Sequence, residues 1–472
     1  MAKLVRRRVG FTGTRSATGP FTWGQRQIWR DIQLMPDAAF YNVSQVLLTA
    51  EGLRLDDVLG QIAELLGRHE SLRTLFRADA AGELRQQVLA AGEVEVEVLL
   101  ADSDADHDIV GLFEDEERRM VGTAFDNAAE VPFRALVGVL DGMPRVLILC
   151  VSHLAADLLS VRVLIDEMSA ALTALAAGRR PPEVPRSRQP VDQAEWERSA
   201  QGSRRMDKAL RYWAGQLSAV PPTMFPVACG ETVPSPRYWR GGLTSRAIPP
   251  ALHALAERYR TTTSVVLLAA TVAMLGRLNG LPACAVQLVV GNRFTPELRH
   301  AIGNLTQEVL ATVDLHGESF EDVVKTTWSA AMGAYRHGQF DPARAAELVR
   351  EASRERGVEI DLSCYFNDLW ANTQTPAKGF HPTARGLREA MATTAFRWED
   401  RTDEDSVKFF LEAFDVFGEP EMLRFSLIAD TFYMPPAVIK AFLTGLERLL
   451  VELVTREVNL DEIAAVSGLP AR

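Results

Sequence analysis

The spacing of apolar and polar residues predicts that strands and helices alternate in the first part of the chain. Residues 42–49 have strand character, and in residues 94–100 valine alternates with glutamate, as expected of a half-buried strand. Residues 55–66 carry apolar side chains at the spacing of an amphipathic helix. This part of the chain is therefore expected to pack both types of element around an apolar core.

A strand pair and a long helix follow. Residues 133–140 and 145–151 have strand patterns separated by Asp141–Gly142, a favourable pair for a hairpin turn. The second strand is apolar almost throughout, so we expect it to lie in the interior of its sheet. From Leu158 to Ala176 the apolar residues have helical spacing.

The second part of the chain continues this mixture. Strands are predicted at residues 285–290, 308–313, 361–366, 407–416 and 423–428, and helices near residues 207–217, 250–260, 264–278 and 435–455. Ser264 is the expected N-cap of the third helix. Residues 371–405 lack clear periodicity and are predicted to form a long crossing or active-site loop. The patterns together predict an α/β fold, with an α+β sandwich in each half.

Proline divides the chain into two halves. Prolines cluster at positions 181, 182, 185 and 190, which indicates a linker. The first residues are basic and then rich in Gly, Ser and Thr, which is typical of a flexible leader. The predicted organisation is a leader (1–20), an N-terminal lobe (21–180), a linker (181–200) and a C-terminal lobe (201–472).

Composition and charge narrow the class of protein. The chain has 472 residues, 47% hydrophobic and 24% charged, as in an ordinary folded protein. Its net charge of −11 argues against a nucleic-acid binder that acts through a general positive field. The four cysteines are far apart, which excludes a disulfide framework and disfavours a zinc site. Because no segment has the apolar pattern of a membrane span or a signal peptide, we expect a soluble, cytoplasmic protein.

One short segment carries residues suited to acid–base chemistry. Residues 152–158 (SHLAADL) leave the most apolar strand and enter the long helix. His153, at the exit of a buried strand, is well placed to act as a general base in a cleft. Asp157 opens the helix, where it can cap backbone N–H groups or fix the histidine loop. On these residues alone, a structural histidine beside an ordinary N-cap aspartate is the simpler interpretation.

Several other short motifs lie at separated positions along the chain. They are WGQRQIW (23–29), RHESLRTLF (68–76), FD (125–126), PFR (132–134), YW (212–213), VGNR (290–293), IGNL (302–305) and FN (366–367). In this order, and together with residues 152–158, they resemble the condensation domains of nonribosomal peptide synthetases, in the chloramphenicol-acetyltransferase-like superfamily. That family has the signature His-His-x-x-x-Asp-Gly at the place of residues 152–158. The resemblance covers about residues 21–455.

The resemblance implies a fold and roles for individual residues. The implied fold is two chloramphenicol-acetyltransferase-like lobes arranged as a V-shaped pseudo-dimer with a central tunnel. His153 matches the second histidine of the signature, the one regarded as catalytic. Asp157 matches the signature aspartate, and Arg293 matches an arginine of the other lobe that holds it in a structural ion pair. The further candidates near the tunnel and substrate are Trp23, Gln25, Asn304 and Asn367.

Two residues depart from the family signature. Ser152 replaces the first histidine, which mainly supports the loop, and its hydroxyl can make some of the same contacts. Leu158 replaces the glycine, which lets substrate approach the backbone closely. Retention of His153 is consistent with turnover, whereas the two replacements motivate an alternative without catalysis.

The leading hypothesis is a free-standing condensation enzyme, an acyltransferase of natural product biosynthesis. It would transfer an acyl or aminoacyl thioester, carried on the phosphopantetheine of a carrier protein, to an amine or hydroxyl nucleophile, forming an amide or ester. Since the chain has no carrier-domain serine motif and no adenylation motif, peptidyl or acyl carrier proteins are expected to act in trans, or the substrate to arrive as a small molecule. No bound cofactor or metal is expected, because the thioester already supplies the leaving group. No nucleic-acid or membrane partner is expected either, given the net charge and the lack of a long apolar segment.

Two alternatives remain open. One is a catalytically silent condensation-like domain that binds a carrier-bound peptide or recruits a tailoring enzyme. The other is an acyl-CoA-dependent acyltransferase of the same superfamily. A basic helical face (Arg204, Arg205, Lys208 and Arg211) is interpreted either as solvated surface or as a docking patch for a carrier protein. His69 is expected to be structural.

Overall fold

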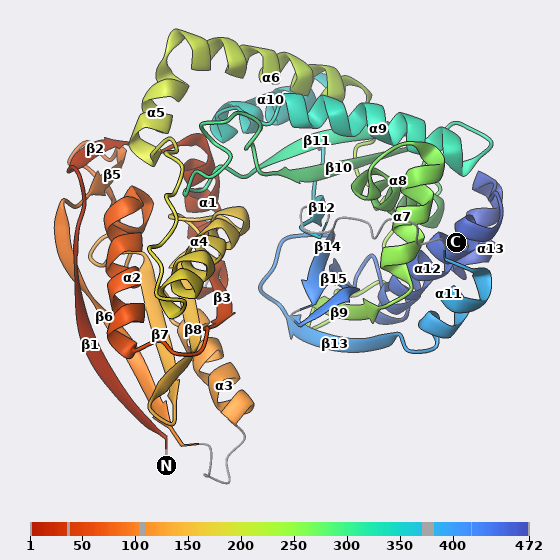
Figure 1. Ribbon diagram of the computed structural model, residues 1–472. Helices are drawn as coiled ribbons and strands as arrows, with labels where there is room; N and C mark the ends of the chain where they lie inside the picture. The colour runs from red at the N-terminus through yellow and green to blue at the C-terminus, as the bar shows by residue number, and fades with distance from the viewer. Residues whose placement is uncertain (1, 35–37, 103–108, 371–381, 417, 471–472) are drawn as a thin grey trace. The chain divides into compact units, whose positions relative to one another are not determined.

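The chain forms two compact units in the computed structural model, which describes residues 2–34, 38–102, 109–370, 382–416 and 418–470. The first unit comprises Met1–Arg205 with Gly291–Gln307, and the second comprises Met206–Val290 with Glu308–Arg472. Each unit combines a large sheet with helices, so the predicted mixed α/β class is confirmed (Figure 1).

The unit boundaries differ from the predicted lobes in two places. The break falls within helix α6 (Ala200–Ala219) and not before residue 201. Residues 291–307, assigned from the sequence to the C-terminal lobe, belong to the first unit. Ile302 of this segment lies in the hydrophobic core of the first unit, and Arg293 is bonded to residues of that unit, which accounts for the assignment.

The first unit is built on a five-stranded sheet. In spatial order its strands are β1 (Lys3–Thr12), β6 (Ala91–Ala101), β7 (Phe133–Leu140), β8 (Met143–Ser152) and β3 (Asn42–Leu48). All neighbouring pairs are antiparallel except β6 and β7. Because β8 pairs with β7 on one side and β3 on the other, the prediction that this apolar strand is interior is confirmed.

Both faces of this sheet are covered by helices. Helices α2 (Leu55–Arg68) and α4 (Leu158–Ala176) lie side by side on one face, and α3 (Ile109–Val121) packs on the other (Figure 1). The side chains of β8 point alternately to the two faces of the sheet. Leu147, Leu149 and Val151 join the core under α2 and α4, whereas Val146, Ile148 and Cys150 join the smaller core under α3.

The N-terminal residues form a strand, so the predicted flexible leader is wrong. Strand β1 pairs with β6 along its whole length, from Lys3 opposite Leu100 to Thr12 opposite Ala91. Val9 and Phe11 are buried in the core on one side of the strand. On the other side Arg6 pairs with Glu95 and Glu97 of the neighbouring strand, and Arg8 with Glu93. Arg6 and Arg8, two of the basic residues that suggested a leader, are therefore part of the solvent-exposed face of an edge strand.

Shorter elements complete the first unit. They are β2 (Ala17–Pro20), β5 (Leu84–Val88) and β4 (Thr74–Ala78), which form a three-stranded sheet, helix α1 (Trp23–Leu34), the 3₁₀ turns η1 (Ala38–Tyr41) and η2 (Glu70–Arg73), and helix α5 (Pro190–Arg198). The expected linker is thus partly helical, since Pro190 is the first residue of α5, a position where proline is favourable.

The second unit is built on a seven-stranded sheet. Its strands in spatial order are β11 (Gln307–Asp314), β10 (Ala283–Val290), β12 (Cys364–Asp368), β14 (Phe409–Val416), β15 (Glu419–Asp430), β9 (Tyr238–Ser245) and β13 (Ala395–Thr402). Strands β10, β12 and β14 are parallel, and those from β14 to β13 are antiparallel.

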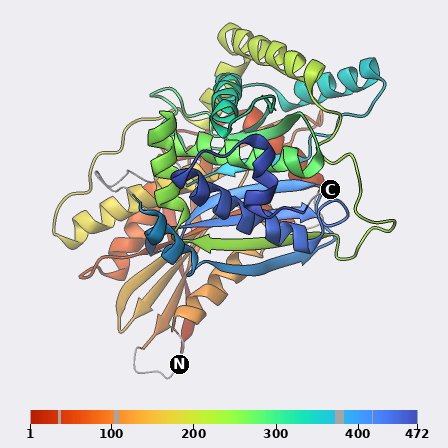
Figure 2. The ribbon, with the colours of Figure 1, turned by 90° about the vertical axis from the view of Figure 1, so that its right-hand side faces the viewer.

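The helices of the second unit are α7 (Ile248–Tyr259), α8 (Thr263–Asn279), α9 (Phe320–Arg336), α10 (Pro342–Arg356), α11 (Ala384–Met391), α12 (Pro436–Thr455) and α13 (Ile463–Ser467), with the 3₁₀ turn η3 (Leu460–Glu462). Helices α7, α8 and α12 share one large core with the sheet, and α12 lies across its strands (Figure 2). Thr262, and not Ser264, caps α8, because its side chain accepts the N–H of Val265.

The prediction of a single loop over residues 371–405 is wrong for residues 382–405, the part that the structure describes. Residues 371–381 lie outside the described residues, but α11 and the edge strand β13 follow. In β13, Phe396 and Trp398 pack against the core while Arg397 between them is exposed, an alternation hidden by the charged residues that follow.

Within the described residues, no single helix has the length and apolar character to cross a membrane, although α7 and α8, a pair bent by 98°, meet those criteria jointly.

Candidate active site

The loop that leaves β8 is held by main-chain and side-chain bonds. The N–H of His153 donates to the carbonyl of Tyr41 at 3.0 Å. The N–H groups of Ala155 and Ala156 donate to the carbonyl of Ser152, and the Ser71 hydroxyl donates to the carbonyl of Ala155. The loop that carries His153 is therefore fixed at both ends by the first unit.

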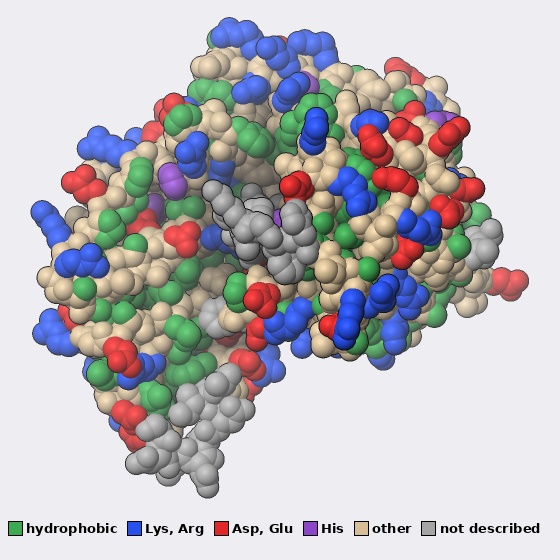
Figure 3. All heavy atoms as spheres, turned by 45° about the vertical axis from the view of Figure 1, so that its right-hand side comes forward, with side chains coloured by type: hydrophobic (Ala, Val, Ile, Leu, Met, Phe, Trp, Pro, Cys, Tyr) green, Lys and Arg blue, Asp and Glu red, His purple; other side chains and the backbone are tan. Residues whose placement is uncertain are grey.

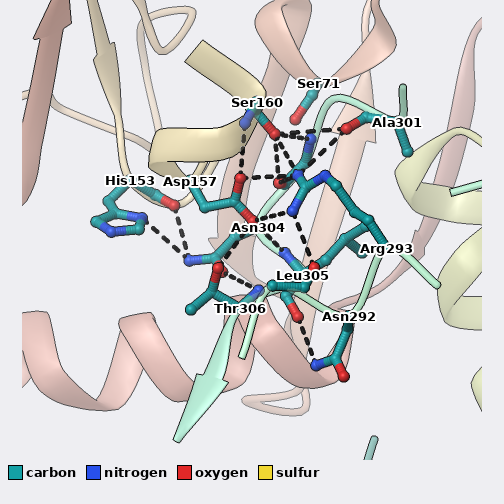
Figure 4. A network of polar contacts seen from close by, with 12 residues as sticks. Ser71, His153, Asp157, Ser160, Asn292, Arg293, Ala301, Asn304, Leu305 and Thr306 are labelled. Atoms are coloured by element: carbon teal, nitrogen blue, oxygen red, sulfur yellow. Dashed lines mark hydrogen bonds and ion pairs between the residues drawn. The ribbon is translucent and has the colours of Figure 1, made fainter. Parts of the chain in front are cut away.

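Asp157 is the N-cap of α4 and the centre of a buried network (Figure 4). Its Oδ1 accepts the Ser160 N–H at 2.8 Å and an Arg293 N–H at 2.7 Å. Its Oδ2 accepts a second Arg293 N–H at 2.8 Å. The Leu305 N–H and the Thr306 hydroxyl also donate to Oδ2, each at 3.0 Å. This carboxylate ties the segment 291–307 to the start of α4.

The Asp157–Arg293 pair is charged despite its burial. The Asp157 side chain is 2% exposed and that of Arg293 is 9% exposed. Burial alone raises the pKa of the Asp157 carboxyl, but the charge of Arg293 and the donated hydrogen bonds outweigh it, so this pKa lies below its ordinary value. The pairing implied by the family resemblance is present, and its two members lie in the same compact unit.

His153 is held by Asn304. The Asn304 side-chain amide donates to the His153 carbonyl at 3.0 Å and lies 3.2 Å from Nδ1 of the ring. The Thr306 N–H donates to the side-chain Oδ1 of Asn304 at 3.2 Å, which fixes the orientation of the amide. Within the described residues, Nε2 of His153 has no hydrogen-bond partner, so it is the ring nitrogen available to a substrate.

Burial lowers the pKa of His153, whereas the charges of Asp157 and Asp31 and the residue's own backbone act in the opposite direction. The net shift is downward from 6.5, so the ring is neutral at pH 7. A neutral imidazole can accept a proton from a nucleophile.

The two departures from the family signature have structural roles. Ser152 is buried, and its hydroxyl accepts the N–H of Leu154 at 3.4 Å. Leu158 opens α4, is partly exposed, and packs against the core under α2 and α4.

The structure gathers only some of the predicted site residues around His153. Trp23 is buried beside Trp196, and its main-chain N–H donates to the Glu197 carboxylate at 2.8 Å. Gln25 is buried and bonded to Thr22 and Gln86, so both candidates anchor the start of α1. Asn367 lies in the second unit on β12, and its amide donates to Glu412 at 3.4 Å.

Sequence reasoning missed Ser160 and Thr306, which complete the network. The Ser160 hydroxyl donates to the Gly303 carbonyl at 2.8 Å and accepts the Gly303 N–H and an Arg293 N–H. The position of Ser160, three residues after the N-cap Asp157, was the available signal, because an N-cap carboxylate bonds the backbone there.

His69 has a structural role. It is buried, its Nε2 lies 2.8 Å from Glu167, and burial lowers its pKa to about 3, so the ring stays neutral.

The four basic residues predicted as a helical face are exposed on α6, where Lys and Arg side chains gather at the upper edge in Figure 3. The described residues contain no group of three or more His, Cys, Asp or Glu side chains arranged to hold a metal.

Known proteins resemble this chain in sequence. It is 29% identical over 341 residues to an isonitrile lipopeptide synthase of Mycobacterium tuberculosis, covering 68% of this chain and 13% of that protein. It is 27% identical over 467 residues to the probable non-canonical nonribosomal peptide synthetase CymA of Salinispora arenicola, covering 94% of this chain and 6% of that protein. The chain thus spans only a small part of these curated relatives.

Solved structures share the fold. The first condensation domain of the calcium-dependent antibiotic synthetase, in complex with a substrate analogue, matches with a TM-score of 0.68 and 18% identity, covering 94% of this chain and 98% of that one. The X-domain in the complex with OxyB from teicoplanin biosynthesis matches with a TM-score of 0.68 and 18% identity, covering 96% and 97%. The family model for the condensation domain matches residues 16–395. The chain belongs to the condensation domain family.

Proposed function

We propose that this chain is an acyltransferase that joins a carrier-bound acyl thioester to an amine or hydroxyl nucleophile. The observation that carries the proposal is the state of His153. Its loop and Asn304 hold the ring, burial keeps it neutral at pH 7, and Nε2 is left for a substrate. Asp157 and Arg293 support the loop without competing for this nitrogen.

The proposed reaction needs one proton transfer at His153. The nucleophile attacks the thioester carbonyl carbon while His153 accepts or orients its proton. Negative charge develops on the carbonyl oxygen, and the N-terminus of α4, whose backbone N–H groups carry partial positive charge, would stabilise it. The C–S bond then breaks, and the proton passes to the leaving sulfur, giving a free thiol on the phosphopantetheine.

Intact-mass spectrometry of loaded carrier proteins tests the proposal. A donor carrier should lose the mass of its acyl group, and an acceptor carrier or free nucleophile should gain the same mass, only when the folded protein is present. His153→Ala is the negative control. Failure to transfer any acyl group across a panel of donors and acceptors, with the protein folded by its melting curve, would contradict the assignment.

A second candidate function is a silent module that binds a carrier-bound peptide or recruits a tailoring enzyme. The replacements Ser152 and Leu158 favour it, and the likeness to the X-domain of the OxyB complex is consistent with it. Leu158 distinguishes the two candidates because its side chain packs against the core while part of it remains accessible.

Leu158→Gly is expected to lower the free energy of unfolding by about 1–3 kcal/mol, through lost apolar burial and the helix cost of glycine. Leu158→Ala is the matched control, because it removes the side chain without the backbone cost. If the chain is an enzyme, both variants should shift donor preference in the loaded-carrier assay. Stability loss with no product from parent or variants would favour the binding module.

A further inference from the structure

Two aromatic residues lead from the surface of the first unit to His153. Phe40 and Tyr41 end the 3₁₀ turn η1, and their rings meet edge to face with centroids 5.2 Å apart. The Tyr41 ring meets the His153 ring in the same manner at 6.4 Å. Both distances lie in the range of favourable aromatic contacts. The three rings therefore form a continuous row, the aromatic row (Phe40, Tyr41 and His153).

The inner end of the aromatic row is held in place. The Tyr41 carbonyl accepts the His153 N–H at 3.0 Å. The Tyr41 side chain packs in one apolar cluster with Leu154 and Ala155, the two residues after His153. The Asn304 amide lies 3.2 Å from Nδ1 of the histidine ring (Figure 4). The ring thus has a polar neighbour at Nδ1 and an aromatic neighbour in Tyr41, while Nε2 is left for a substrate.

The outer end of the aromatic row is open to solvent. Phe40 is 53% exposed, whereas Tyr41 and His153 are partly buried. Single exposed apolar residues are ordinary on protein surfaces, but Phe40 extends an aromatic surface that ends at the candidate general base. An apolar group bound along the row would cover the Phe40 ring and remove its surface from water, which favours binding.

We propose that Phe40 and Tyr41 form a subsite for a hydrocarbon chain of the substrate that reacts at Nε2 of His153. The proposal rests on the proposed acyl transfer and specifies its substrate class: a medium-length aliphatic or aryl-terminated chain, carried by the acyl group or by the nucleophile. Tyr41 contacts the histidine ring, and Phe40 lies one ring further out. A short chain can therefore reach only Tyr41, whereas a longer chain also covers Phe40.

Two series of chain lengths test the proposal without requiring turnover. The donor probes are S-alkyl pantetheine thioethers from ethyl to decyl, and the acceptor probes are primary alkylamines of the same lengths. Calorimetry measures their affinities for the parent and its variants. In at least one series, the affinity of the parent should rise about fourfold for each methylene that the aromatic row covers, the worth of burying one methylene.

Phe40→Ala should bind the short probes of that series within about twofold of the parent and the longest probes about tenfold more weakly, because only a long chain reaches the outer ring. Phe40→Leu keeps an apolar side chain and should restore most of this loss. Leu48→Ala is the matched control, since Leu48 is 62% exposed at the far end of β3, the strand that follows Tyr41. It should bind every probe like the parent.

The series that responds to Phe40→Ala shows whether the acyl group or the nucleophile carries the chain. The Phe40 ring is exposed, so a melting curve like that of the parent is expected for this variant. Affinities that do not depend on chain length in either series overturn the proposal. So does a loss in Phe40→Ala that is equal at all lengths, or a chain-length dependence that matches the parent. Chain-length selectivity that depends on Phe40, in a protein that transfers no acyl group, would instead overturn the proposed function alone.

Discussion

His153→Ala is expected to lower the rate of acyl transfer by about 10²–10⁴-fold, the usual contribution of a positioned acid–base group, with the fold intact. The ring makes few contacts that stabilise the loop, since the Asn304 amide donates to the main-chain carbonyl at 3.0 Å and the loop is held by Tyr41, Ser152 and Ser71. Those bonds remain in the alanine variant. The loss should therefore appear in turnover and not in the melting temperature.

The measurement is the initial rate of product formation by mass spectrometry, together with a melting curve. His300→Ala is the control, because His300 is exposed in the segment that carries Arg293 and Asn304. It should match the parent in both assays. Parent-like turnover of His153→Ala would remove His153 from the reaction, and a loss below tenfold would limit it to orienting the nucleophile.

The pH dependence follows from the lowered pKa of His153. A general base is inactive when protonated, so activity should fall as pH decreases through the pKa of the ring. Since burial moves that pKa below 6.5, the acidic limb of the rate profile should lie below pH 6.5. If activity instead falls at pH 6.5 or above, and the fall remains in variants of His153, the acidic limb of the rate profile does not report the His153 ring.

The sequence predicts elements well where apolar periodicity decides the structure. Strand β8 and helix α4 are apolar enough that their place in the core follows from composition, and the turn between β7 and β8 follows from Asp141–Gly142. The prediction of elements fails where charged residues mask the apolar periodicity. In β1 the arginines dominate the composition, although Val9 and Phe11 face the core on alternate positions.

The candidate site was predictable only in part, because its residues are far apart in the sequence. His153 and Asp157 are close in sequence, but Arg293 and Asn304 reach them through contacts between residues 136 and 151 positions apart. Only the family resemblance indicated Arg293.

Asp157→Ala should have the largest effect on stability, lowering the free energy of unfolding by about 3–5 kcal/mol, because it leaves a buried Arg293 without its partner. It also removes the N-cap of α4 and the acceptor for Leu305 and Thr306. Chemical denaturation measures the change. Asp166→Ala is the control on the same helix, since Asp166 is exposed, and it should change stability by less than about 0.5 kcal/mol.

A double variant separates the unpaired charge from the other losses. Arg293→Leu combined with Asp157→Ala removes both charges, so the double variant should be more stable than the sum of the two single changes predicts. Acid provides a second measure. The pKa of Asp157 lies below 3.8 in the folded state, so its stabilisation is complete above that pH and is lost as pH falls through the folded value. The acid sensitivity from this group should be absent in Asp157→Ala. An Asp157→Ala protein that unfolds like the parent and only loses turnover would show that the carboxylate serves the reaction and that the network of Figure 4 does not hold the segment 291–307 in place.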